Sequence, residues 1–284
     1  MRTVILGARG QLGAAMVHEL SDHDVAPFDR AALDVTDPVN VAAEMARVRP
    51  DVIINCVAYN FVDAAEDHPV EALQNNALAV RTLARAAASG GATLVHFSSD
   101  FVFDGTATVP YAEDDRPNPR SVYAVSKLLG EWFAADAPRH YVLRVESLFG
   151  RAPHGGPAKG SVASILAALR TGQVARVIED RTVSPSLVQD VTRATRQLLE
   201  GRAPAGIYHC VNSGCCTWLE LAHEAARQMG VEPRLEPIRH ADLKLKATRP
   251  QYCALSNDKL RSLGIVMPSW QDALARYLTV DTGI

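Results

Sequence analysis

Two side chains able to exchange a proton stand four positions apart in the segment NPRSVYAVSKLLGEW, residues 118–132. On a helix, Tyr123 and Lys127 lie one turn apart and share a face. An isolated tyrosine has a pKa of about 10, too high for efficient proton exchange near neutral pH. An adjacent ammonium favours the phenolate, and lowering the pKa by ~3 units requires about 4 kcal/mol of differential stabilisation. The pair therefore indicates acid–base chemistry, provided that a reacting group can lie beside it.

A second polar group precedes this pair. The segment HFSSDFVFDG ends a predicted strand, so Ser98, Ser99 and Asp100 should lie at its carboxyl end. Ligands of a doubly wound sheet sit outside the carboxyl ends of its strands. A serine hydroxyl there can donate a hydrogen bond to a substrate carbonyl beside the tyrosine. The alternative is a serine that caps a turn, followed by an ordinary helical tyrosine.

Glycine recurs in the first predicted strand-to-helix turn, GARGQLG, at positions 7, 10 and 13. Glycine lets the chain bend sharply and lets a phosphate approach the backbone. The following helix supplies free N–H groups and a positive dipole end for a pyrophosphate. Because this turn directly follows an N-terminal strand and opens a helix, it has the context of a dinucleotide-binding site.

Asp29 closes the second predicted strand, 19 residues after Gly10. A carboxylate at this position can bind the ribose hydroxyls of adenosine. The alternative for Asp29 is a solvated carboxylate at a strand end. Arg9 and Arg30 could instead receive a 2′-phosphate. The residues therefore predict a nicotinamide dinucleotide and leave NAD and NADP both open.

The elements that must position these residues alternate along the chain. Predicted strands lie at 3–7, 23–29, 51–58 and 92–100, with helices over 38–49 and around 66–88 between them. Such alternation predicts an α/β protein of the Rossmann type, with a doubly wound parallel sheet covered on both faces.

Regularity weakens after RHYVLRV, and residues 151–160 contain enough glycine and proline to form a loop. GIYHCVN is a further predicted strand, and residues 213–284 are mainly helical. We expect a smaller, discontinuous substrate domain built on the later half of the chain. The predicted boundaries are 1–148 with 188–212 for the NAD(P)-binding domain, and 149–187 with 213–284 for the substrate-binding domain.

The composition of the chain limits its possible binding partners and its cellular location. The chain has 284 residues, 48% of them hydrophobic, and a formal net charge of −3, which gives no electrostatic case for nucleic acid or an anionic membrane. Its apolar runs are far shorter than the roughly 18 residues that a membrane span needs, and its N-terminus lacks a secretory pattern. The five cysteines lack zinc-type or CxxC spacing and are expected to be reduced. These features predict a cytoplasmic protein.

Several segments in order carry a family resemblance. The chain resembles the extended short-chain dehydrogenases/reductases and, within that group, the dTDP-4-dehydrorhamnose reductases. The matching segments span nearly the whole chain and are GARGQLG, LDVTDP, PDVIINCVAYNFVDAAE, NALAVRTLARAA, SSDFVFDG, NPRSVYAVSKLLGE, RTVSPSLVQDV, GIYHCVNSGCCTWLELA and ALSNDKLRSLGI.

The resemblance implies reduction of the 4-keto group of a nucleotide-linked deoxysugar by NAD(P)H, with Ser99, Tyr123 and Lys127 as the catalytic triad and Asn76 as a supporting residue. It implies a set of cofactor contacts at Gly7, Arg9, Gly10, Gln11, Leu12, Gly13, Asp29, Asp34, Val35, Ala58, Tyr59, Asn76, Ser98, Tyr123 and Lys127. The expected substrate contacts are Ser99, Asp100, Phe101, Ser147, Val183 and Arg249. A guanidinium such as that of Arg249 pairs well with a nucleotide diphosphate, although a surface role is the alternative.

Two departures from the family pattern concern the substrate. Related 4,6-dehydratases place a glutamate after the aspartate, whereas Asp100 is followed by Phe101, so dehydratase chemistry lacks its base. Reductases of the rhamnose pathway carry RTSWVYG after the fifth strand, whereas this chain has RVESLFG, with Ser147 at the place of the tryptophan. A small hydroxyl beside Glu146 should alter the packing of the sugar. No acidic C-terminal cluster is evident, and no metal is predicted.

Other conspicuous side chains have simpler interpretations. Trp218 and Trp270 fall on helical patterns and are expected in the core, and His154 is interpreted as a solvated loop residue that could instead touch substrate.

Two alternatives to the reductase stay open. One is an epimerase or a dehydrogenase of another nucleotide sugar. The other is a non-catalytic dinucleotide-binding subunit, like the regulatory partner of methionine adenosyltransferase. A homodimer is also left open.

Overall fold

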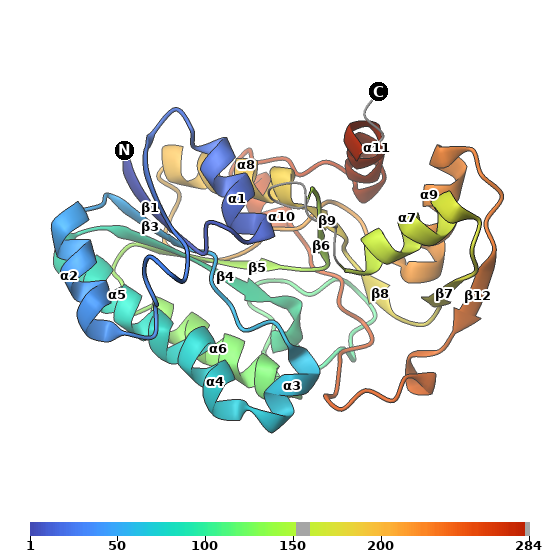
Figure 1. Ribbon diagram of the computed structural model, residues 1–284, viewed down its shortest axis with the longest axis horizontal. Coiled ribbons are helices and arrows are strands. Elements are labelled where there is room, and N and C mark those ends of the chain that lie inside the picture. The colour runs from blue at the N-terminus through green and yellow to red at the C-terminus, as the bar shows by residue number, and fades with distance from the viewer. Residues whose placement is uncertain (152–159, 282–284) are drawn as a thin grey trace.

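The computed structural model describes residues 1–151 and 160–281, and a six-stranded parallel sheet lies at its centre (Figure 1). The strand order is β10-β5-β4-β3-β1-β2, so the chain runs outward from β1 to β2 and then crosses to β3 on the other side. This reversal between β1 and β3 creates the crevice that doubly wound sheets use for ligands. The strands are β1 (Arg2–Leu6), β2 (Asp24–Phe28), β3 (Val52–Asn55), β4 (Thr93–Ser99), β5 (His140–Val145) and β10 (Gly206–His209).

The central strands are apolar on both faces. β1 buries four consecutive residues and β3 buries all four of its residues, in a register that places Ile5 opposite Ile54. Branched aliphatic residues on both sides of a strand suit a sheet that is covered by helices on both faces. The predicted doubly wound α/β fold is confirmed.

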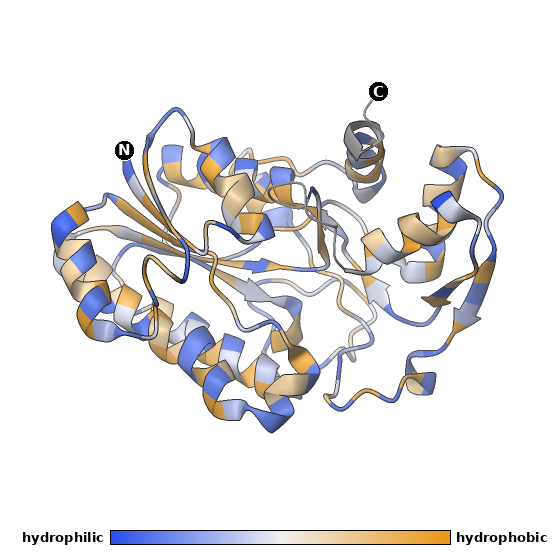
Figure 2. Ribbon diagram, viewed as in Figure 1, coloured by the Kyte–Doolittle hydropathy of each residue, from blue (hydrophilic) through white to orange (hydrophobic). Residues whose placement is uncertain are grey.

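Helices form a layer on each side of the sheet (Figure 1). α1 (Gln11–Glu19) and α8 (Val188–Glu200) pack together on one side, and α2 (Pro38–Val48), α5 (Ala79–Gly90) and α6 (Val122–Ala134) pack on the other. Apolar residues of these helices belong to the clusters that pack against the sheet, and hydrophilic residues alternate with them along each helix (Figure 2). In α6, however, the polar Lys127 and Glu131 are buried and Trp132 is exposed. Across the described ranges, no helix has the length and apolar character that a membrane crossing requires.

The predicted long helix around 66–88 is present as one continuous helical stretch over residues 69–90, preceded by a separate short helix. The segments are α3 (Val62–Asp67), α4 (Pro69–Leu73), a π-helical turn η1 (Gln74–Leu78) and α5. Pro69 provides no backbone N–H and biases His68 away from helical angles, which ends α3. The π turn buries Asn76 against α6.

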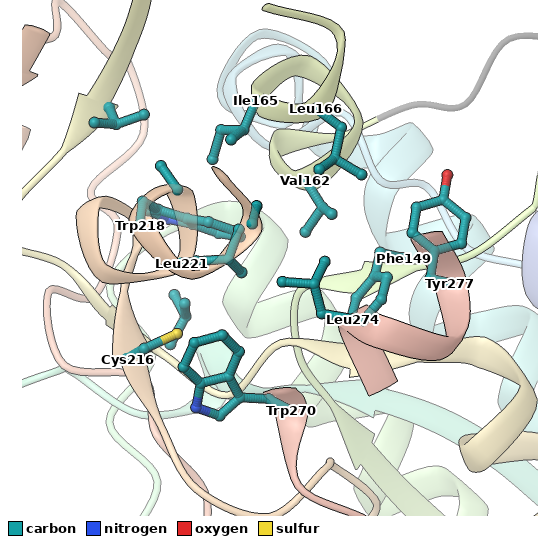
Figure 3. Close-up of a cluster of buried hydrophobic side chains, with 14 of the residues drawn as sticks. Phe149, Val162, Ile165, Leu166, Cys216, Trp218, Leu221, Trp270, Leu274 and Tyr277 are labelled. Carbon is teal, nitrogen blue, oxygen red and sulfur yellow. The ribbon is translucent and has the colours of Figure 1, made fainter. Parts of the chain in front are cut away.

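A separate hydrophobic cluster supports the later part of the chain (Figure 3). It contains Trp218 and Trp270, as predicted, with Leu221 and Leu274 beside them. Its side chains come from residues 149–187 and 216–278, and the division into two domains at the predicted boundaries stays a prediction. The elements of this part are β6 (Leu148–Phe149), α7 (Ser161–Thr171), β7 (Ala175–Ile178), β8 (Thr182–Val183), β9 (Ser186–Leu187), β11 (Cys216–Thr217), α9 (Trp218–Met229), β12 (Leu235–Ile238), η4 (His240–Asp242) and α11 (Trp270–Asp281). The short helix α10 (Asp258–Ser262) instead packs on β10 through Leu260.

Candidate active site

A cavity of about 520 Å³ opens at the carboxyl ends of β1, β3, β4 and β5, where the strand order reverses. Its wall includes residues of the α1 N-terminus, of α6, and of the part of the chain around α7 and α9. It gathers twelve of the predicted site residues, which are Gly10, Gln11, Leu12, Ala58, Ser98, Ser99, Asp100, Phe101, Tyr123, Lys127, Ser147 and Arg249.

Tyr123 sits in the first turn of α6, which begins where the Ser121 hydroxyl accepts the Ala124 N–H at 3.2 Å. The phenol is only 8% exposed and packs edge-on against Phe101, with ring centroids 5.4 Å apart. Burial raises the pKa of Tyr123 above its ordinary value, the nearby Asp100 raises it further, and a hydrogen bond with Ser99 lowers it. The hydroxyl is therefore a protonated acid near neutral pH in the unliganded protein.

Lys127 lies one turn further along α6 and is 2% exposed. Its ammonium donates to the Phe97 carbonyl oxygen at 2.5 Å. Burial lowers the pKa of Lys127 to about 8, and the carboxylate of Glu131 opposes this shift. The lysine is thus held in place by the carbonyl at the end of β4, with a charge that is easily lost.

Glu131 belongs to a buried ion pair behind the cavity. Its carboxylate accepts two bonds from the Arg144 guanidinium, at 2.9 and 2.8 Å, and one from the Ser98 hydroxyl at 2.6 Å. Arg144 also lies over the Phe103 ring, 4.9 Å from its centroid. This network fixes the end of β4 and one face of α6 relative to each other.

Ser99 ends β4, where the 3₁₀ turn η2 (Asp100–Val102) begins. A hydrogen bond of 2.9 Å joins its hydroxyl to Asp100 Oδ1, and the Ser99 hydroxyl oxygen also accepts the Phe101 N–H at 3.2 Å. Ser99 therefore does cap a turn, as the simpler interpretation of the sequence has it, and it also lines the cavity beside Tyr123.

The glycine turn leaves the start of α1 open. Gly7 has a left-handed φ of 75°, and the N-terminal residue Gly10 makes no side-chain capping bond, so the first N–H groups face the cavity mouth. A Cβ at Gly13 would lie 2.2 Å from the Gly7 carbonyl oxygen, so only glycine allows this close helix–turn contact. The end of the helix has the form that a phosphate group requires.

The remaining predicted cofactor contacts do not line the cavity. Asp29 accepts the Ala32 N–H at 2.9 Å and pairs with Arg9 at 3.3 Å, and these contacts keep the pKa of Asp29 low. Three others make contacts within the protein. The Asp34 carboxylate accepts hydrogen bonds from Thr36, Val35 is buried in the core, and the Asn76 amide forms hydrogen bonds with the Tyr59 backbone and the Ser126 hydroxyl.

Two predicted substrate contacts have other partners. Val183 is fully buried in the hydrophobic cluster of Figure 3 and lies outside the cavity wall, because the short strand β8 turns its side chain into that core. Arg249 lines the cavity, but its guanidinium is already paired with Asp63 at 2.7 Å. His154 lies outside the described residues.

Sequence reasoning missed a buried acidic cluster. Asp100, Glu146 and Cys253 bring one potential metal-ligand atom each to within 4.8 Å of one another, in the only such group within residues 1–151 and 160–281. The Arg181 guanidinium donates to the Cys253 sulfur at 3.4 Å, so a positive charge already faces the cluster. Four distant segments supply these residues, and the one available signal was the position of Glu146 beside Ser147.

The parallel sheet with its open glycine turn defines a Rossmann-type oxidoreductase of the extended short-chain dehydrogenase/reductase class, which uses NAD(P). The family model described as the RmlD substrate binding domain matches residues 1–282. The chain belongs to this family.

Named relatives agree with this assignment. A probable dTDP-4,6-dihydroxy-2-methyloxan-3-one 4-ketoreductase of Streptomyces antibioticus is 37% identical, over 96% of this chain and 93% of its own. The dTDP-4-dehydrorhamnose reductase of Salmonella typhimurium is 32% identical, over 98% of this chain and 97% of its own. The crystal structure of dTDP-4-dehydrorhamnose reductase from Bacillus anthracis, in complex with NADP, has a TM-score of 0.92 at 31% identity, covering 98% of each chain.

Proposed function

We propose that the protein reduces the 4-keto group of a dTDP-activated deoxysugar at the expense of NAD(P)H. The observation that carries this proposal is that Ser99, Tyr123 and Lys127 line one cavity, which extends to the open N-terminus of α1. The names of the 4-ketoreductase and dehydrorhamnose reductase relatives support the substrate class.

The chain's residues fit a dinucleotide. The uncapped start of α1 would hold the pyrophosphate, Asp29 would bind the adenosine ribose, and Lys127 would bind the nicotinamide ribose. When bound, the reduced dinucleotide supplies the hydride for the keto carbon. Arg9 beside Asp29 offers a cation for a 2′-phosphate, so both NADH and NADPH remain in the proposal.

Tyr123 gives its proton to the keto oxygen as that oxygen gains negative charge. A raised pKa suits this direction of reaction, since the phenol stays protonated until the developing alkoxide accepts the proton. Ser99 donates a hydrogen bond to the same oxygen and stabilises the charge. The Lys127 ammonium offsets the negative charge left on Tyr123 after the transfer.

The sugar lies against a wall that is polar where rhamnose-pathway reductases have an indole. Ser147 occupies that place with a left-handed φ of 43°, and Glu146 precedes it. A wall of this kind favours a sugar that presents hydroxyl groups over one that presents an apolar face.

The proposal places the enzyme in the cytoplasm, where reduced cofactor is available, and all five cysteines are free thiols, as a reducing compartment requires. The homodimer left open by the sequence stays a prediction that size-exclusion chromatography with light scattering tests.

The test follows absorbance of NADH and NADPH with freshly prepared dTDP-4-keto-6-deoxysugars. We expect substrate-dependent loss of reduced cofactor that falls at least ~100-fold in Tyr123→Phe, because the proton donor is lost. Tyr141→Phe is the matched control, since that buried hydroxyl donates to the Ala203 carbonyl, away from the cavity. Sugar inversion without net consumption of cofactor would replace the reductase with an epimerase. Tight dinucleotide binding without turnover of any sugar would favour a binding subunit.

A further inference from the structure

Two carboxyl groups that the proposed mechanism does not use meet behind Ser99. Asp100 follows β4 and is 3% exposed, and Glu146 follows β5 and is 2% exposed. Their oxygens and the Cys253 sulfur lie within 4.8 Å of one another. Both carboxyl groups also belong to the cavity wall, so their state bears on the substrate.

The charges of this cluster balance only if it holds a proton. The guanidinium of Arg181 is buried with the two carboxyl groups and supplies one positive charge. Two ionised carboxylates beside it would leave a net negative charge out of water, which is strongly unfavourable. One proton shared by Asp100 and Glu146 makes the cluster neutral.

The hydrogen bonds indicate which carboxyl carries the proton. Glu146 accepts the Ser184 backbone N–H at 2.5 Å and the Ser147 hydroxyl at 3.4 Å, and both donors stabilise an anion. Asp100 Oδ2, in contrast, is buried without a hydrogen-bond partner in the described structure. Negative charge therefore resides on Glu146, and the proton resides on Asp100.

This placement decides what Ser99 can offer the substrate. A hydroxyl has one donor and two acceptor sites. With Asp100 protonated, the 2.9 Å contact runs from Asp100 to Ser99, which already accepts the Phe101 N–H, so the Ser99 O–H is left for the cavity. With Asp100 ionised, the Ser99 O–H is taken by Asp100, and a lone pair would face the substrate carbonyl.

We propose that Glu146 is a positioning residue acting through Asp100: the two buried carboxyl groups share one proton, which resides on Asp100 and frees the Ser99 hydroxyl to donate to the substrate carbonyl. This inference rests on the proposed function, because the reacting carbonyl is that of the keto-sugar. It gives the departure RVESLFG a role in catalysis beyond the shape of the sugar site.

Other titratable groups face the pair from every side. Burial raises the pKa of both carboxyl groups, and Arg181 lowers both. An ionised Asp100 would raise the pKa of Glu146 further, which opposes ionisation of both groups at once. The neighbouring thiols and phenols have raised pKa values and are neutral near neutral pH, and they are Tyr123, Cys215, Cys216, Tyr252 and Cys253. Lys127 and Arg249 line the same cavity but are held by the Phe97 carbonyl and by Asp63.

The kinetic test compares pH profiles of kcat for keto-sugar reduction. The active form has Asp100 protonated, so activity is present below its pKa and is lost as pH rises through it. Glu146→Gln removes the neighbouring anion, and we expect this alkaline limb to move down by about 1–2 pH units, with KM for NADPH unchanged. Asp100→Asn should lose this limb and keep the one set by Lys127, because its amide N–H donates to Ser99 at every pH.

Two controls separate positioning from structure. Glu113→Gln alters a half-buried carboxylate that accepts the His209 N–H at 2.8 Å outside the cavity, and it should leave the profile unchanged. In a Ser99→Ala background, Glu146→Gln should shift the limb no further. An unshifted limb in Glu146→Gln, or a loss of more than ~100-fold in Asp100→Asn at every pH, would overturn the proposal.

A spectroscopic measurement is independent of the substrate. Infrared spectra of the unliganded protein should show a protonated-carboxyl band near neutral pH that shifts when aspartate is isotope-labelled and is absent from Asp100→Asn. A band insensitive to the label, or the lack of any band, would refute the proton on Asp100. Wild-type inactivity on every keto-sugar, with the labelled band present, would instead count against the proposed substrate alone.

Discussion

Replacing Lys127 with methionine should abolish turnover and yet stabilise the unliganded fold at neutral pH. The ammonium is 2% exposed, and its pKa is lowered to about 8 from an ordinary value of about 10.5. We infer that this unfavourable burial of charge is retained because the ammonium is required for catalysis. Methionine has a similar length and no charge to bury.

The magnitude follows from the pKa of Lys127. A difference of about 2.5 units corresponds to about 3 kcal/mol, because one unit is worth about 1.4 kcal/mol. This cost is present in full below the folded pKa of about 8 and disappears as pH rises toward the unfolded value. The lost hydrogen bond to the Phe97 carbonyl subtracts about 1 kcal/mol, so Lys127→Met should gain roughly 2 kcal/mol at neutral pH.

Guanidinium denaturation of both proteins at about pH 7 and about pH 9.5 measures this effect. Between these two pH values the free energy of unfolding of wild type should rise by about 2 kcal/mol relative to that of the mutant. The reason is that Lys127 binds more protons in the unfolded chain than in the folded one over this interval, while all other groups titrate alike in the two proteins. A stability difference between the two proteins that stays constant with pH would refute a lowered pKa for Lys127. Dinucleotide titration of the mutant should show weakened binding and would confirm that the lysine is retained for function.

Three further predictions concern the ion pair, the glycine turn and the thiols. Glu131→Gln should lower the free energy of unfolding by about 3–5 kcal/mol in denaturant titrations, because Arg144 is left buried without its carboxylate; an unchanged midpoint would contradict this. Gly13→Ala should weaken dinucleotide binding at least ~10-fold by calorimetry, since its Cβ meets the turn at 2.2 Å, whereas Gly90→Ala, with nothing within 4 Å, should bind normally. A chromogenic disulfide reagent should modify Cys215 first, because it is the only one of the five thiols that is exposed, and fast loss of several thiols would argue against this core.

The sequence predicts those parts of the site whose residues lie close together along the chain. A serine at the end of an apolar run and a Tyr–Lys pair one helical turn apart become neighbours once the sheet is parallel and doubly wound. The glycine turn is likewise local, since strand, turn and helix N-terminus are contiguous from β1 to α1. Such features follow from the periodicity of the backbone and do not depend on how side chains from distant segments pack.

Contacts between distant segments were beyond the reach of sequence spacing. Asp100, Glu146, Arg181 and Cys253 converge from four separate segments, and each is an ordinary polar residue in its own segment. The sequence predicts that Arg249 binds a nucleotide diphosphate, but its guanidinium already pairs with Asp63, which lies 186 positions away in the sequence. In the same way, the helical pattern around 66–88 did not show that the long helix begins at Pro69 and contains a π turn.

The two walls of the cavity rest on different hydrophobic cores. The triad is carried by β4 and α6, which pack with the sheet, whereas Trp218 and Val162 on the opposite wall belong to the cluster of Figure 3. Substitutions in one core can therefore accumulate without displacing the other. A lineage, or a laboratory library, could therefore change the sugar it accepts through cluster residues on that wall, such as Val162 and Trp218, while β4 and α6 keep the proton-transfer residues in place.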